Sequence, residues 1–397
     1  MRMSMYRSAW WGPPKKFDRP DEERKVSWLE LFYDLVYVIA ISRITHKLAL
    51  ESNLGAFIEY TFLFTLIFWG WLNGSMYHDL HGNEGLRTRL MTLWQMMIIA
   101  ALAVEIELTP VHSYRNITVV FMIMQLYITY MWWSIGFYDK SHRRYNMPYT
   151  ILYLLAFAFM GASMFLSKSW LKAIVPIILV CNYAPPFIAQ VLLRRDNSDL
   201  DLSPSMAERL GLFAIIVFGE VVLGVVNGIS NTGVPGLRGW LNFSLAISIV
   251  FSLWWIFFTL VAQRLVKRGF NNASRLELLY IPSLISLGLI AVSFTSFFET
   301  QHQIPLQKLG YAIAVFLGSV SLMMNLLVLP SNFNALKKPA HRSLLVTAAF
   351  YVIFSLLSIR LNRLLFLIIV LSGLLAEIIY LNSLYYRIIN KDEGESY

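Results

Sequence analysis

The stretch VSWLELFYDLVYVIAISRITHKLA, residues 26–49, decides the fold, because an apolar run of membrane length carries acids, an arginine and a histidine. A helix needs about 20 apolar residues to cross the hydrocarbon core of a bilayer. A charged side chain near the bilayer centre costs about 2.5 to 3.5 kcal/mol on insertion scales, so it needs a partner, a hydrated cavity or a function. The stretch therefore predicts a membrane helix whose charged groups are paired, hydrated or functional.

The composition of the whole chain supports this interpretation. Of its 397 residues, 57% are hydrophobic and 14% are charged, and the mean hydropathy is +0.56. Soluble proteins carry about 25% charged residues. A soluble protein of this size could not bury so many hydrophobic runs in its core, because its surface is too large relative to its volume. We therefore exclude soluble enzymes and nucleic-acid-binding proteins, and we expect membrane lipids as partners.

Twelve windows are long and apolar enough to predict transmembrane helices. They are 28–49, 54–75, 88–108, 116–138, 149–167, 170–193, 207–229, 240–262, 276–298, 308–329, 343–359 and 362–386. The predicted fold is an all-α, polytopic membrane helical bundle of about twelve spans. The window 343–359 is short and 28–49 is charged, so the count falls to eleven or ten if either does not span.

The loop charges give the orientation, because Lys and Arg collect on the cytoplasmic side. With twelve spans, 24 of the 33 Lys and Arg residues lie on one side and eight on the other. Both termini are therefore predicted to be cytoplasmic. The predicted parts are a basic N-terminal segment (1–27), a first six-helix repeat (28–193), a cytoplasmic linker (194–206), a second six-helix repeat (207–386) and a cytoplasmic tail (387–397).

Two short matches indicate that the halves are related. Leu31-Phe32 matches Leu212-Phe213 at an offset of 181, and Trp69-Gly70-Trp71 resembles Trp254-Trp255 at an offset near 185. An even number of spans in each half gives parallel repeats rather than inverted ones. We therefore predict a parallel six-plus-six internal repeat.

The string 26–49 and ERLGLFAIIVFGEVVLGV, residues 208–225, resemble the two signatures of the bacterial low-temperature-requirement A family. The resemblance implies a multi-pass inner-membrane protein linked to growth in the cold, with no settled biochemical activity. Two positions depart from the family pattern, since Leu210 and Tyr280 stand where members often have histidine. Any role tied to those imidazoles is in doubt for this chain.

The first window concentrates the polar groups. At about 100° per residue, Glu30, Asp34, Tyr37 and Ile41 share one stripe of the helix, whereas Arg43 lies on the opposite face. Polar groups on both faces predict a helix surrounded by protein. Glu30 and Asp34 either pair with basic residues at the ends of neighbouring helices or, for Asp34 above all, serve a function.

Arg43 and His46 lie toward the non-cytoplasmic end of the same window. One interpretation is an ion pair between Arg43 and Glu105 or Glu107, because arginine can extend toward the interface. The other interpretation is that Arg43 and His46 form an anion or proton site.

Glu220 lies 13 residues into its window, which is about 19 Å along a helix, too deep to reach the interface. Gly224 and Gly228 beside it have the spacing that lets another helix approach closely, and Gly70 and Gly74 repeat that spacing. Packing accounts for the glycines but not for the carboxylate. We therefore predict Glu220 as the central proton-binding or ligand-binding group.

Two further places are candidates for binding. Pro185 and Pro186 remove two backbone donors and must bend or break the helix next to Asn182, where free carbonyls could bind a cation or a substrate. Glu377 is a deep acid, either hydrogen-bonded for structure or able to bind protons. The segment His78-Asp79-Leu80-His81 has metal-compatible spacing, but a solvated loop is the favoured interpretation.

No catalytic motif, metal site or cofactor is predicted. Cys181 is the single cysteine, and the chain has no phosphate-binding glycine loop, serine nucleophile elbow or HExxH. The first hypothesis is an ion- or proton-coupled transporter of an unknown small solute. The alternatives are a lipid-handling or intramembrane enzyme, and a structural or sensory membrane protein needed for growth in the cold.

Overall fold

The computed structural model describes residues 26–51, 53–81, 85–108, 114–138, 143–193, 202–230, 236–262, 264–297, 306–329, 334–358 and 361–394. Within these ranges the chain forms 13 helices, and its extended pairing is limited to one isolated bridge between Val266 and Leu327. The predicted all-α class is therefore confirmed. The segment 1–25 and most of the predicted linker, 194–201, lie outside the described residues.

The helices of the first half of the chain are α2 (Trp28–Leu50), α3 (Leu54–His81), α4 (Leu86–Leu108), α5 (Tyr114–Tyr138), α6 (Arg143–Ser163), α7 (Lys168–Tyr183) and α8 (Pro185–Leu193). Those of the second half are α9 (Pro204–Ser230), α10 (Leu237–Leu260), α11 (Phe270–Phe297), α12 (Leu306–Leu326), α13 (Asn334–Leu357) and α14 (Arg363–Gly394). A helix or a bent helix pair accounts for most of each predicted window.

Nine of the described helices are long and apolar enough to cross a membrane, or ten if the bent pair α7 and α8 counts as one span. The two predicted windows that do not qualify are those of α2 and α6, and α2 carries Glu30, Asp34 and Arg43 within its first 18 residues. The short eleventh window does qualify, because its helix extends toward the N-terminus as Ala335–Leu357. A count of twelve spans stays a prediction.

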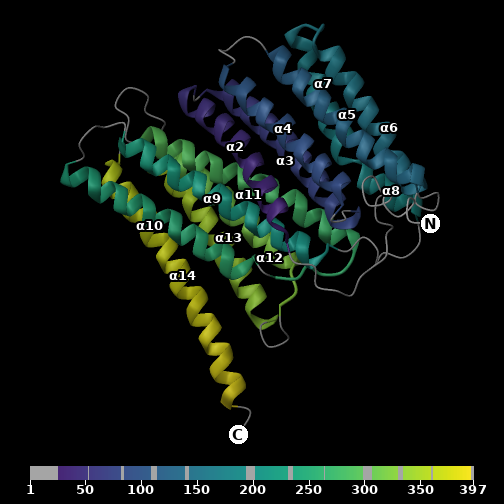
Figure 1. Cartoon of the computed structure of the whole chain (residues 1–397). Helices are drawn as coiled ribbons and strands as arrows, with labels where there is room; N and C mark the ends of the chain where they lie inside the picture. The colour runs from purple at the N-terminus through teal and green to yellow at the C-terminus, as the bar shows by residue number, and fades with distance from the viewer. Residues whose placement is uncertain are drawn as a thin grey trace. The chain divides into compact units, whose positions relative to one another are not determined.

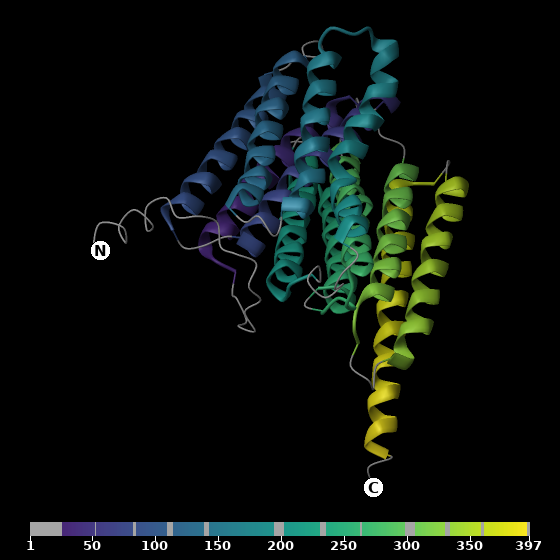
Figure 2. The same cartoon turned by 90° about the vertical axis from the view of Figure 1, so that its right-hand side faces the viewer.

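The chain divides into two compact units. Unit 1 contains the described residues up to Ile44 and from Ile58 to the end of α8, and unit 2 contains Thr45–Phe57 and the described residues from α9 onward. In unit 1, α5 packs against α4 and α6, and α6 also contacts α7 and α8 (Figure 1). In unit 2, α11 packs against α9 and α12, α12 against α13, and α14 against α10 and α13 (Figure 2). The six-plus-six repeat stays a prediction.

Phenylalanines fill the middle of unit 2. The ring of Phe257 lies 6.1 Å from the rings of both Phe218 and Phe316 and 6.0 Å from that of Tyr280. The rings of Phe218 and Phe316 meet edge to face at 5.9 Å, a favourable arrangement of two aromatic quadrupoles. These four rings join α9, α10, α11 and α12 around an apolar centre.

The close approach of α9 and α11 occurs at Gly224. A Cβ atom there would lie 2.6 Å from the carbonyl oxygen of Ala291, and the Thr295 hydroxyl donates to the Gly224 carbonyl at 3.3 Å. The small-residue interpretation is therefore confirmed at this position. A Cβ atom added to Gly219, beside Glu220, would have nothing within 4 Å, so no close helix contact depends on Gly219.

Two predictions need correction. His78 and His81 are buried in the last turn of α3 rather than placed in a solvated loop, because the helix continues through them. The helix α2 is not surrounded by protein, since Phe32, Leu35 and Ile39 on one of its faces are exposed.

Candidate functional site

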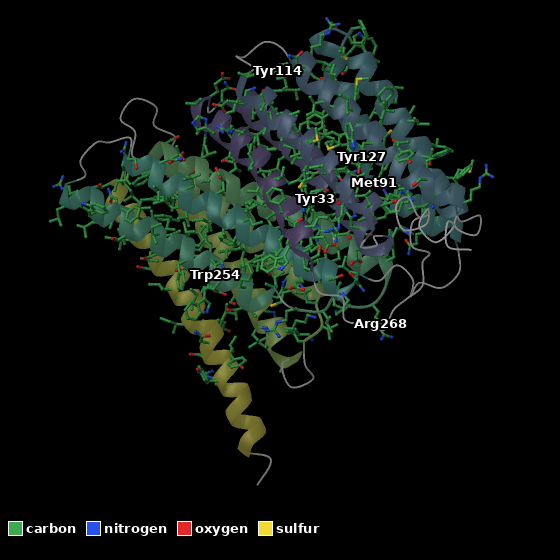
Figure 3. All side chains as sticks on the ribbon, in the orientation of Figure 1. Tyr33, Met91, Tyr114, Tyr127, Trp254 and Arg268 are labelled. Atoms are coloured by element: carbon green, nitrogen blue, oxygen red, sulfur yellow. The ribbon has the colours of Figure 1, made fainter. Side chains whose placement is uncertain are left out.

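Unit 1 buries a continuous group of polar and aromatic side chains, to which Tyr33 in Figure 3 belongs. We call this group the polar core. Its members, all less than 9% exposed, are Tyr33, Asp34, Tyr37, Trp69, Trp71, Asn73, Gln95, Gln125, Trp132, Asn146, Tyr153 and Asn182. They come from α2, α3, α4, α5, α6 and α7, so nearly every helix of the unit contributes to it.

The acid of the polar core is Asp34. The predicted stripe of α2 is buried, and Asp34, Tyr37 and Ile41 are completely inaccessible. The indole nitrogen of Trp71 on α3 donates to Asp34 Oδ1 over 2.7 Å. This partner is a neutral donor on a neighbouring helix, and the pairing of Asp34 with a basic residue stays a prediction.

Next to Asp34, the glycines of α3 make room for polar side chains. The Gln95 amide donates to the Tyr37 hydroxyl at 2.8 Å and to the Gly70 carbonyl at 3.1 Å. A Cβ atom on Gly74 would clash with the Tyr33 hydroxyl and would lie 2.6 Å from the Gln95 amide. The Gly70 and Gly74 spacing was interpreted as a contact between helix backbones. Instead it accommodates two tyrosines and an amide.

Asn73 organises the other side of the polar core. Its Oδ1 atom accepts from Tyr153 on α6 at 2.6 Å and from the Trp132 indole on α5 at 3.1 Å, while its own amide donates to the Trp69 carbonyl at 3.0 Å. Trp132 also stacks on Tyr149 with ring centroids 4.3 Å apart. One asparagine therefore connects three helices through charge-neutral hydrogen bonds.

Trp69 explains how the broken helix is stabilised. The axes of α7 and α8 differ by 49°, as the double proline predicted. Pro186 has no N–H to donate to the carbonyl four residues earlier, that of Asn182. The Trp69 indole donates to this carbonyl at 2.8 Å and takes the place of the missing backbone donor. The carbonyl expected to be available for a ligand is thus used within the fold.

Seven amide atoms of the polar core have no hydrogen-bond partner among the described residues. They are Gln95 Oε1, Gln125 Oε1 and Nε2, Asn146 Oδ1 and Nδ2, and Asn182 Oδ1 and Nδ2. Helical periodicity places Gln125 on the Trp132 face of α5 and Asn146 on the Tyr153 face of α6. Leaving a buried polar atom without a hydrogen bond costs about 1 to 3 kcal/mol. The set is therefore suited to hydrogen-bonding partners beyond the protein itself.

Nearer α4, Tyr127 of α5 donates to the carbonyl of Met91, and both are labelled in Figure 3. His78 contacts the Thr92 hydroxyl at 3.0 Å. Within the described ranges, no three histidine, cysteine or acidic side chains converge as a metal site requires. The chemistry of the polar core is that of amides, indoles, phenols and one carboxylate.

Arg43 and His46 lie outside the polar core. Arg43 forms an ion pair of 3.2 Å with Glu107 of α4, and the two side chains are 47% and 48% exposed. The predicted pairing of Arg43 is therefore confirmed. His46 is exposed, and the structure gives no contact that joins it to Arg43 in a binding site.

Glu30 belongs to the start of α2. Its carboxylate accepts hydrogen bonds from the Ser27 N–H at 2.8 Å and from the Ser27 hydroxyl at 2.9 Å. In return, the Glu30 N–H donates to the Ser27 hydroxyl at 3.3 Å. This reciprocal arrangement is a capping box. The S-x-x-E signature at 27–30 was present in the sequence, and it gives Glu30 a local structural role.

The two remaining acids differ in their surroundings. Glu377 of α14 is buried, and its two oxygens accept from the hydroxyls of Ser343 at 2.7 Å and Thr347 at 2.8 Å on α13. This geometry favours the interpretation of Glu377 as a hydrogen-bonded structural acid. Glu220 is half-buried on α9, one turn before the Gly224 crossing. Both Glu220 and Glu377 belong to unit 2.

The sequence interpretation missed Asn73, Trp69 and Trp71 as site residues. The tryptophans served in the sequence analysis only as markers of the internal repeat. A signal was available for Trp69 and Trp71, because indole N–H groups in a membrane span need acceptors, and Asp34 and the proline-freed carbonyl are acceptors. Which donor meets which acceptor depends on the packing of the helices.

The apolar helices and the buried polar core define a multi-span helical membrane protein. The family described as bacterial low temperature requirement A protein (LtrA) matches residues 25–379, and the chain belongs to this family. The chain is also similar to an uncharacterized protein of Rhizobium meliloti (strain 1021). The two are 23% identical over 319 residues, which cover 75% of each chain.

Proposed function

We propose that this chain is an inner-membrane carrier of a small polar solute, coupled to an ion or a proton, and that the solute binds in the polar core of unit 1. The observation that carries the proposal is the set of seven buried amide atoms with no hydrogen-bond partner among the described residues. Asparagine and glutamine present donors and acceptors side by side, so they suit a solute that has both.

Asp34 is the residue we assign to coupling in unit 1. It is completely buried, and its Oδ1 atom accepts from Trp71. An acid at such depth changes its interaction with neighbouring helices when it gains or loses a proton or a cation. Glu220 stays a predicted proton-binding group of unit 2, to be tested on its own. Both termini remain predicted to be cytoplasmic, and membrane lipids remain the expected surroundings.

The broken helix α7–α8 supports a carrier further. Discontinuous helices in transporters end near the substrate and leave polar groups directed at it. Asn182 lies at the end of α7, and its side-chain atoms are among those without a partner. The amide of Asn182 is thus the group that we expect to contact the solute.

The test is accessibility of the polar core to water, because it requires no knowledge of the solute. In a Cys181→Ser background, which removes the single cysteine, Asn182→Cys and Gln125→Cys are labelled with a small charged methanethiosulfonate reagent. The control is Ala246→Cys, a fully buried position on α10 of unit 2. We expect labelling at 182 and 125 and not at 246. Unlabelled cysteines at both polar-core positions would contradict the proposal.

A flux assay then tests transport directly. Proteoliposomes are mixed with glycerol, urea, glycine or proline, and solute entry is followed by stopped-flow light scattering. A pH dye inside the vesicles follows proton movement. We expect protein-dependent entry of at least one of these solutes, and its loss in Asn182→Leu. The matched control is Asn242→Leu, because Asn242 of α10 in unit 2 also has a buried oxygen without a partner among the described residues. Equal loss in both variants would indicate a folding defect rather than a binding site.

A further inference from the structure

One end of unit 2 gathers basic side chains without any acid among them. The segments 263–275 and 327–342 contain no Asp or Glu. Their seven basic residues are Arg264, Lys267, Arg268, Arg275, Lys337, Lys338 and Arg342. In the part of the chain that the structure describes, none of these seven forms an ion pair with a carboxylate. In Figure 3 the side chain of Arg268 projects away from the ribbon.

A short backbone pairing holds these two segments together. The N–H of Lys267 donates to the carbonyl of Leu326 at 2.9 Å, and that of Val328 donates to the carbonyl of Leu265 at 2.7 Å. Gly269, with φ of 107°, then turns the chain into α11, a backbone conformation that favours glycine. The positions of Lys267 and its neighbours are therefore fixed relative to α13.

The pairing brings two lysines together. Lys337 donates from Nζ to the Leu327 carbonyl at 2.6 Å, which anchors its side chain over the bridge. Lys267 directly follows the bridge residue Val266, so the two lysines flank the same bridge. Two like charges placed on one bridge favour an anion between them. A pair of lysines in segments that contain no Asp or Glu is an arrangement that a phosphate can bind.

The surroundings indicate which phosphate. Leu265 and Val328, on either side of the bridge, are 59% and 46% exposed. Lys337 lies near the start of the candidate span Ala335–Leu357, at the depth where lipid headgroups meet the hydrocarbon. A soluble phosphate has no use for exposed apolar side chains, whereas an acyl chain covers them.

We propose that Lys267 and Lys337 form a binding site for the phosphate headgroup of an anionic phospholipid, whose acyl chains lie against Leu265 and Val328. This inference is independent of the transport proposed for unit 1. It differs from the general attraction of basic loops to acidic membranes, because it assigns the binding to two particular lysines out of seven.

The experiment uses the full chain in a neutral detergent and measures bound lipid by native mass spectrometry. Phosphatidylglycerol and phosphatidylcholine with matched acyl chains are titrated against the protein. We expect phosphatidylglycerol to bind at least tenfold more tightly, because each basic group near an anionic headgroup contributes about 1 kcal/mol. Equal retention of the two lipids would overturn the proposal.

A pair of charge-matched variants separates a site from diffuse attraction. Lys267→Gln/Lys337→Gln should weaken phosphatidylglycerol binding about thirtyfold, by the same reasoning for two contacts. Arg275→Gln/Lys338→Gln removes as much charge from the same end of unit 2 and should weaken binding less than about twofold. Equal weakening by both pairs would overturn the proposal. If Lys337→Gln disturbs folding, Lys267→Gln alone is used, since the side chain of Lys267 is exposed.

A competition with inorganic phosphate distinguishes the source of the anion. We expect millimolar phosphate to leave phosphatidylglycerol bound, because the lipid adds the contacts of its acyl chains. Displacement by phosphate at that concentration would assign the two lysines to a soluble anion and overturn the assignment to a lipid.

Discussion

Unit 1 packs tryptophan, tyrosine and amide side chains in its interior, whereas the middle of unit 2 is packed with phenylalanines around Phe257. With the offset of 181 residues, the position that corresponds to Asp34 is Ile215, which is 43% exposed. With the offset of 185, the position of Trp71 corresponds to Ile256, which is buried among apolar neighbours. If the halves arose by duplication, the acid and its indole donor belong to the first half alone. Among the described residues, the buried amide side chains all belong to unit 1, whereas unit 2 buries mainly serines and the acids Glu277 and Glu377. The proposed binding is therefore assigned to unit 1.

Replacing a tightly packed glycine by alanine in each unit is expected to have the largest effect on stability. Gly224→Ala in unit 2 places Cβ against the Ala291 backbone, and Gly74→Ala in unit 1 places it against the Tyr33 hydroxyl. We expect each to lower the free energy of unfolding by roughly 1 to 3 kcal/mol, with Gly224→Ala the worse because a backbone cannot move aside. Thermal unfolding in detergent measures both.

The control for these variants is Gly219→Ala, on the same helix as Gly224, with nothing within 4 Å of the added atom. It should be neutral or stabilising by up to about 1 kcal/mol, since alanine favours the helix. A Gly74→Ala protein as stable as the wild type would show that the polar core is loosely packed, against the contacts described for it.

Substitutions of Asp34 are expected to have the next largest effect on stability. Asp34→Leu leaves the Trp71 N–H without its acceptor in a buried site, so we expect a loss of about 1 to 3 kcal/mol. Asp34→Asn keeps an acceptor oxygen and should fold with nearly wild-type stability, yet lose activity if Asp34 couples transport to an ion. Thermal stability and growth of a deletion strain at low temperature measure the two effects separately. Low folded yield of Asp34→Asn, with activity preserved in the protein that folds, would remove Asp34 from the site.

Two tyrosine hydroxyls offer a matched comparison between the units. Tyr153 donates to Asn73 in unit 1, and Tyr351 donates to the Val370 carbonyl in unit 2, each over 2.6 Å. Phenylalanine at either position should cost about 1 kcal/mol of stability. Only Tyr153→Phe should alter solute flux, because only Asn73 belongs to the polar core. Equal effects of the two variants on flux would end the functional distinction between the units.

Glu220→Gln should have the smallest effect on stability, within about 0.5 kcal/mol, because the side chain is half-buried. If Glu220 binds protons for transport, this variant folds normally and abolishes proton movement in the dye assay, while Glu220→Asp retains a fraction. Full growth in the cold with Glu220→Gln, at matched expression, would leave Asp34 as the remaining coupling candidate.

Helical periodicity carried most of the correct predictions. The buried stripe of α2, the bend at Pro185 and the Arg43 to Glu107 pair follow from spacing, backbone chemistry and charge, which are local properties. The hub at Asn73 could not be predicted, because its donors are 59 and 80 residues away and meet it only after α3, α5 and α6 have packed. The error at His78 has a different cause, since polar side chains do not end a helix whose neighbours can bury them.

The bond between the Trp69 indole and the Asn182 carbonyl has a consequence for how this sequence can change over evolution. An alanine at 186 would restore the backbone N–H that competes for that carbonyl, and the displaced indole would then need another acceptor inside the membrane. Losing Trp69 while keeping the proline leaves the carbonyl without a donor instead. Either single step is therefore costly, so Trp69 and Pro186 are expected to be exchanged together or not at all among relatives.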